Sequence, residues 1–85
     1  MSEIFFAAQR EIERTRAEYP GNKLRYMVAA EECGEFVQAC SKALRADYAG
    51  NLEAKHLDAI REEGIQAIAA IVRAIEELDS EVFSV

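Results

Sequence analysis

The chain has 85 residues, of which 51% are hydrophobic and 31% are charged, and it contains one proline and four glycines. This length and composition predict a single domain, 1–85, and exclude a disordered or collagen-like protein. The net charge of −6 disfavours binding to nucleic acid or anionic lipid, because like charges repel. The longest uncharged apolar stretch, Ile65 to Val72, is far shorter than the ~20 residues of a membrane span, and no secretion signal is evident. We therefore expect a cytoplasmic protein without a nucleic-acid or membrane partner.

Hydrophobic periodicity and turn residues predict three helices and no strands. Ser2 is a suitable N-cap for the first helix, and Pro20 in the turn sequence 19–22 ends it. A second joint is predicted at 47–51, where Gly50 and Asn51 favour a turn. The predicted helix bounds are 2–18, about 23–46, and from 52 or 53 to about 79, with a short tail over 80–85. The fold class is all-α.

Cys33 and Cys40 are predicted to be reduced packing residues. They lie seven residues apart in one predicted helix, which places them roughly 10 Å apart along its axis and prevents an intrachain disulfide. Together with His56 they show no spacing typical of a zinc site. We interpret His56 as a packed or capping histidine.

The third predicted helix indicates an oligomer. Between Ile65 and Ile75 only Gln66 and Arg73 are polar, and a helix that is apolar nearly all round must be covered nearly all round. A three-helix chain leaves part of such a helix uncovered. We expect a homo-oligomer, most simply a dimer in which the second and third helices of both chains form a four-helix core, or a tetramer. A monomeric three-helix bundle is the alternative.

Three glutamates lie within apolar stripes on a helical wheel of 100° per residue. Glu32 and Glu35 belong to the stripe of the second helix, and Glu63 to that of the third. The apolar members are Val28, Ala29, Phe36, Ala39, Cys40 and Ala43 in the second helix, and Ala59, Ile60, Ala67, Ala70, Ile71 and Ala74 in the third. Carboxylates near an apolar interior cost several kcal/mol unless something compensates. Because carboxylate oxygens are hard ligands, we expect a site for Mg²⁺, Mn²⁺ or Ca²⁺.

Each acidic cluster also contains a glycine in mid-helix, Gly34 in one and Gly64 in the other. Each glycine costs about 1 kcal/mol relative to alanine in a helix. We expect these glycines and the nearby alanines to leave room for a bound ligand. The alternative is that the glutamates are solvated, or paired with Arg25, Lys42, Arg61 or Arg73, on ordinary acidic helix faces.

Two spaced motifs resemble those of a known family. Glu31-Glu32-Cys33-Gly34-Glu35 has the form EExxE, and after 27 intervening residues Glu63-Gly64-Ile65-Gln66 stands in the place of an ExxD. Their order and spacing, with the similar run 35–42, resemble the MazG-like all-α nucleoside triphosphate pyrophosphohydrolases over about residues 24–78. The resemblance implies a dimeric or tetrameric helical bundle. It also implies Mg²⁺-dependent hydrolysis (Mn²⁺ as a substitute) of an NTP or dNTP to the monophosphate and pyrophosphate.

The resemblance also implies roles for individual residues. Position by position, it assigns metal binding to Glu32, Glu35, Glu63 and Gln66, catalysis to Glu31 and Glu32, and polyphosphate contacts to Lys42 and Arg45. Glu31 matches an outer ligand or a base that orients water. Gln66 departs from the pattern, because its amide oxygen brings no charge and should hold Mg²⁺ more weakly than the expected Asp. Two other functions remain open: a catalytically weak nucleotide- or metal-binding module of the same fold, and a helical oligomeric scaffold without enzymatic activity.

Overall fold

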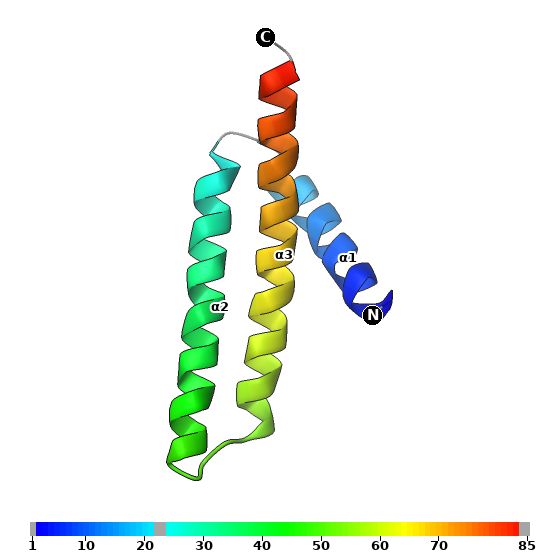
Figure 1. Ribbon diagram of the computed structural model, residues 1–85. Coiled ribbons are helices and arrows are strands. Elements are labelled where there is room, and N and C mark those ends of the chain that lie inside the picture. Colours follow the sequence, from blue (N-terminus) through cyan, green and yellow to red (C-terminus); the bar gives the residue numbers. More distant parts are fainter. Residues whose placement is uncertain (1, 22–23, 84–85) are drawn as a thin grey trace.

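The computed structural model describes residues 2–21 and 24–83, and it shows three helices with no strand in those ranges (Figure 1). The helices are α1 (Ser2–Glu18), α2 (Arg25–Tyr48) and α3 (Ala54–Phe83). The predicted all-α class is confirmed. Over the described parts of the chain, no helix combines the length and the apolar character that crossing a bilayer requires.

The helix bounds agree with the sequence prediction at some ends and differ at others. Ser2 is the first residue of α1 rather than a residue before it, and α2 ends two residues later than predicted. The predicted start of the second helix at residue 23 lies outside the described residues. The prediction of a tail over 80–85 is wrong for residues 80–83, because α3 continues to Phe83. Those four residues contain neither proline nor glycine, so nothing in them ends a helix.

Helices α2 and α3 form an antiparallel hairpin and lie side by side along their length (Figure 1). Gly50 adopts a φ of 74° at the end of α2, a left-handed conformation that favours glycine. The N–H of Asn51 donates to the Ala46 carbonyl at 2.7 Å, which closes the last turn. Nδ1 of His56 then accepts the N–H of Glu53 at 3.0 Å just before α3, so His56 caps this helix as predicted.

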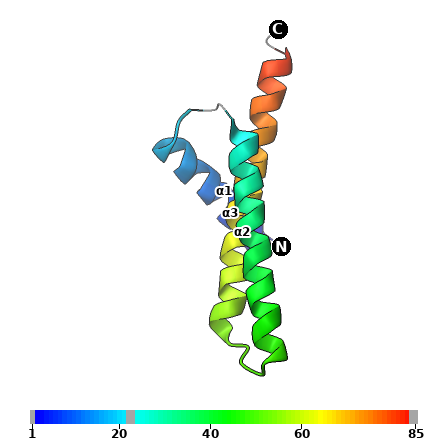
Figure 2. The same ribbon diagram turned by 90° about the vertical axis from the view of Figure 1, so that its left-hand side faces the viewer.

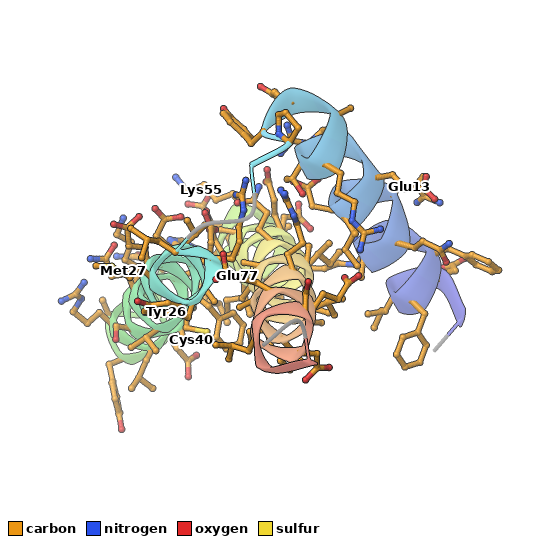
Figure 3. All side chains as sticks on the ribbon, turned by 90° about the horizontal axis from the view of Figure 1, so that it is seen from above. Glu13, Tyr26, Met27, Cys40, Lys55 and Glu77 are labelled. Atoms are coloured by element: carbon orange, nitrogen blue, oxygen red, sulfur yellow. The ribbon has the colours of Figure 1, made fainter. Side chains whose placement is uncertain are left out.

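The start of α2 is capped from another helix. Leu24 precedes α2 with a φ of 60° and gives it no side-chain cap. Instead, the Arg25 N–H donates to Oε1 of Glu77 on α3 at 3.0 Å, and Figure 3 shows Glu77 beside the first turn of α2. A carboxylate at this position satisfies a free N–H group and complements the positive end of the helix dipole.

Helix α1 crosses α3 obliquely, and both α1 and α2 pack against α3 rather than against each other (Figures 1 and 2). Arg16 on α1 forms an ion pair with Glu76 on α3. Below the turn that follows α1, Nη2 of Arg73 donates to the Tyr19 carbonyl at 2.8 Å. Helix α3 is therefore the element that positions the other two.

The interior of the single chain is built from small side chains. The buried apolar residues among those described are Ala8, Ala29, Ala39, Ala43, Ala67, Ala69 and Ala74. No large side chain in the described part of the chain is fully buried, whereas Val37, Leu44 and Ile75 are each more than half exposed. Two charged residues, Arg73 and Glu77, are buried with 5% exposure each. This distribution is the reverse of an ordinary hydrophobic core.

The shape of the chain agrees with that distribution. Its radius of gyration is 15.1 Å, whereas a compact chain of this length has about 12 Å. Its accessible surface is 6308 Å², about 1,300 Å² more than the roughly 5,000 Å² of a compact monomer of this mass. The single chain thus leaves an unusually large surface exposed to water.

Candidate metal centre

Three predicted carboxylates converge between α2 and α3. Glu32 and Glu35 lie on α2 and Glu63 lies on α3, and one oxygen from each falls within 4.8 Å of the others. Residues three apart share a helix face, and the hairpin brings that face of α2 against α3. The sequence motifs EExxE and ExxQ therefore contribute to the same place in the structure.

Two of the three carboxylates have oxygens without a partner. Oε2 of Glu32 and Oε2 of Glu63 are shielded from solvent and accept no hydrogen bond from the described residues. Burial raises the pKa of Glu32, and the nearby charges of Glu35 and Glu63 raise it further. Burial also raises the pKa of Glu63, followed by the charge of Glu35, while Lys42 opposes the shift. The cluster is therefore destabilised in its charged state and would be relieved by a cation.

The spacing of these oxygens fits a divalent cation. Two oxygens bonded to the same ion at about 2.1–2.4 Å stand no more than about 4.8 Å apart, and the three carboxylates each offer an oxygen within this limit. The donor set consists of hard carboxylate oxygens, which suits Mg²⁺ or Mn²⁺ rather than a soft metal. Glu32, Glu35 and Glu63 would hold the ion.

The remaining predicted site residues are not part of this cluster, but two of them line pockets that include a cluster residue. Gln66 lines the same pocket as Glu32, on the α1 side of the cluster. Lys42 lines a pocket with Glu35 and Glu63 on the other side. Glu31 is exposed on α2, and its carboxylate does not belong to the cluster.

Arg45 is the predicted site residue with the least support from the structure. It lies in the last turn of α2 and is exposed. It does not line the pocket of Lys42, although it is only one turn further along. The structure therefore gives Lys42 a position beside the cluster and gives Arg45 none.

A pocket of about 470 Å³ opens beside the cluster towards the α2–α3 connection. Lys42, Lys55 and His56 line it together with Glu35 and Glu63. Because Nδ1 of His56 accepts the Glu53 N–H, the neutral ring carries its proton on Nε2 and has one donor left. Positive charge and a donor thus stand next to the carboxylates.

A second pocket, of about 240 Å³, lies on the opposite side of the cluster between all three helices. Arg14, Arg25 and Arg73 line it, and it includes Glu32. We call it the arginine pocket. Sequence reasoning missed it, although the isolated charge of Arg73 in the apolar segment 65–75 was a visible signal.

The prediction that the mid-helix glycines leave room for a ligand is wrong for Gly64 and untested for Gly34. A Cβ on Gly64 would stand 3.2 Å from Cε1 of Phe36, so this glycine makes room for the Phe36 ring rather than for a ligand. A Cβ on Gly34 would meet nothing within 4 Å, because this residue is exposed. The two cysteines are both free, as predicted.

Comparison with known proteins finds no match: no family model, curated protein or solved structure is similar to this chain.

Proposed function

We propose that this protein is a metal-dependent nucleoside triphosphate pyrophosphohydrolase of the MazG-like kind, releasing a nucleoside monophosphate and pyrophosphate. The observation that carries the proposal is the convergence of Glu32, Glu35 and Glu63, with unpartnered buried oxygens on two of them. A polar side chain that is buried without a partner is costly, so the arrangement favours a ligand that supplies the missing charge. The resemblance of the EExxE and ExxQ motifs supports this choice of reaction.

Each residue around the cluster has a role in this proposal. Mg²⁺, when bound, supplies charge neutralisation at the phosphate oxygens and lowers the pKa of coordinated water. Glu32, Glu35 and Glu63 hold the cation, and Gln66 adds a neutral oxygen from the neighbouring pocket. Lys42 offers its ammonium group to the polyphosphate from the other side. Glu31, exposed and outside the cluster, acts only through water, as an outer ligand or a base.

A substrate panel tests the reaction. Purified protein is incubated with each NTP and dNTP and with Mg²⁺, and both products are identified. We expect the monophosphate and pyrophosphate in equal amounts, and no product when EDTA replaces Mg²⁺. Release of orthophosphate, or no turnover of any nucleotide, would contradict the proposal.

The neutral amide of Gln66 favours a second candidate, a nucleotide- or metal-binding module of weak activity, because three carboxylates hold Mg²⁺ less firmly than four. Calorimetry with Mg²⁺ and a non-hydrolysable nucleotide separates this module from a scaffold. Binding without turnover identifies the module. Absence of binding at millimolar ligand leaves the helical scaffold.

We also propose that the protein is a homodimer or a higher homo-oligomer, with a second copy covering the apolar side of the α2–α3 hairpin. An apolar groove of about 410 Å³ runs along this side. Its members include Phe36, Ile60, Gly64, Ile68 and Ile71. The excess surface of about 1,300 Å² exceeds the roughly 800 Å² that each partner contributes to a standard interface. A second copy is the occupant that is always present at matching concentration.

A further inference from the structure

Arg73 is a buried cation that lacks a full set of partners. It is only 5% exposed. Its Nη2 donates to the carbonyls of Tyr19 at 2.8 Å and Gly21 at 3.3 Å, whereas its Nη1 is shielded from solvent and has no partner among the described residues. A buried guanidinium nitrogen without a hydrogen-bond acceptor costs free energy unless a ligand supplies that acceptor.

The charges around Arg73 are of both signs: the guanidinium groups of Arg16 and Arg25 act on it, and Glu76 and Glu77 line a pocket with it. Burial lowers the pKa of Arg73, and the guanidinium groups of Arg25 and Arg16 lower it further, with Glu76 alone acting in the opposite direction. Glu76 is already paired with Arg16. Among the described side chains, no carboxylate lies within ion-pair distance of Arg73. Its guanidinium group therefore has no bonded counterion there.

The arginine pocket supplies the space for such a counterion. Arg14 and Arg25 line it with Arg73, and Glu11 and Glu32 are the acidic residues of its wall. Glu11 is engaged by Arg14, whose Nε lies 3.2 Å from both of its carboxylate oxygens. Arg14 is paired with both Glu11 and Glu18, so Arg73 and Arg25 are the arginines of this pocket that have no carboxylate partner among the described side chains. Glu32 belongs to the carboxylate cluster. The planar, forked donors of arginine suit phosphate oxygens.

We propose that the arginine pocket binds a phosphate group, with Arg73 and Arg25 as its fixed donors and Arg14 at its mouth. The identity of this phosphate as part of the substrate or product rests on the proposed function. The pocket shares Glu32 with the carboxylate cluster, so a phosphate in it lies next to the metal site. Arg73 and Arg25 also bind the carbonyls of the turn after α1, which joins this pocket to the end of α1.

The test is calorimetric titration of the metal-free protein, in EDTA, with inorganic phosphate and with pyrophosphate. A nucleoside monophosphate and the matching nucleoside form the other two arms. We expect millimolar or tighter binding of the phosphate-containing ligands and none of the nucleoside. Tighter binding of the monophosphate than of phosphate identifies a nucleotide as the source, and equal binding identifies a free phosphate; both support the pocket. Absence of phosphate and pyrophosphate binding at tens of millimolar overturns it.

Two variants with opposite expected effects on phosphate affinity distinguish a phosphate site from a purely structural role of Arg73. Arg14→Gln should weaken phosphate binding at least threefold, because it removes a positive charge at the mouth. Glu11→Gln should strengthen it at least threefold, because it removes a negative charge from the wall and leaves Arg14 paired with Glu18 alone. Arg10→Gln, an exposed arginine on α1 outside the pocket, should leave it unchanged. Equal affinity in all three variants would overturn the proposal without requiring Arg73 to be replaced.

Repeating the titration with Glu35→Gln separates this inference from the proposed enzyme. Glu35 is not a wall residue of the arginine pocket, so metal-free phosphate binding should persist while metal-dependent hydrolysis is lost. Binding without hydrolysis in the natural protein would contradict the enzyme but keep the pocket. Hydrolysis in a protein that does not bind phosphate without metal would contradict the pocket but keep the enzyme.

Discussion

Each side of the α2–α3 hairpin leaves a different feature uncompensated: carboxylate charge on one side and apolar surface on the other. One side carries the cluster of Glu32, Glu35 and Glu63, whose repulsion a single small cation would relieve. The other side presents an apolar groove, which only a surface of several hundred Å² covers. Glu63 of the cluster and Gly64 of the groove are neighbours on α3, about 100° apart around the helix. Because the two deficits lie on different faces of α3, metal binding and self-association should be separable by mutation.

The largest expected effect is on the charged side. Replacing Glu35 with Gln removes one of the three carboxylate charges that would surround the cation, while the side-chain volume stays nearly the same. Pyrophosphate release should fall at least 100-fold, about 2.7 kcal/mol in transition-state stabilisation, while the oligomeric mass stays the same. Glu13→Gln, an exposed acid on α1 that is labelled in Figure 3, is the matched control and should keep full activity. Full activity of Glu35→Gln would remove the carboxylate cluster from the mechanism.

The next effect is on the apolar side. Ile68 lines the groove and is 40% exposed in the single chain. Ile68→Glu places a charge in the interface, so light scattering should show a shift from at least twice the chain mass to the chain mass of 9.5 kDa. Ala17→Glu on α1 is the control with an added surface charge. A natural protein that already runs at 9.5 kDa at high concentration would refute the dimer.

The metal affinity of Ile68→Glu tests whether the carboxylate cluster and the apolar groove are independent of each other. If the two sides are independent, Mg²⁺ titration of the monomeric variant should give a Kd within about threefold of the natural value. A much weaker Kd would mean that the second copy supports the site, and the separation of the two sides would fail.

A smaller effect concerns pH. The folded-state pKa values of Glu32 and Glu63 are raised above 4.5, so the folded protein binds more protons than the unfolded chain between 4.5 and those raised values. The metal-free protein should therefore lose stability as pH rises through that window. Urea titrations in EDTA at several pH values measure this slope, which Mg²⁺ or the change Glu63→Gln should reduce. A metal-free stability that rises with pH would contradict it.

The smallest effect compares the two helical glycines. Gly34→Ala should stabilise the protein by about 1 kcal/mol, because the new methyl group meets nothing and alanine favours the helix. Gly64→Ala gains the same helix propensity but brings Cβ to 3.2 Å from the Phe36 ring, so its stability should not increase. Equal stabilisation by both changes, measured by thermal unfolding, would show that the Phe36 ring moves aside at little cost in free energy.

The meeting of the three carboxylates between α2 and α3 could be predicted from the sequence. Helical spacing placed Glu32, Glu35 and Glu63 on apolar stripes, and a short connection made the two stripes meet. The roles of Arg73 and Glu77 could not be foreseen in this way. Their partners are backbone groups of Tyr19, Gly21 and Arg25, whose positions depend on how α1 and α2 lie against α3. The purpose of Gly64 likewise depends on the rotation of α2 against α3, which sets where Phe36 points.

The order of the helices along the chain has a consequence for synthesis. The α2–α3 hairpin closes through a five-residue connection, whereas Arg16 meets Glu76 across 60 residues. Helix α1 leaves the ribosome before α3, which provides the surface that receives it. Local contacts form fastest, so the hairpin should form before α1 docks, and α1 with its exposed Phe5 and Phe6 should wait undocked until α3 has been made.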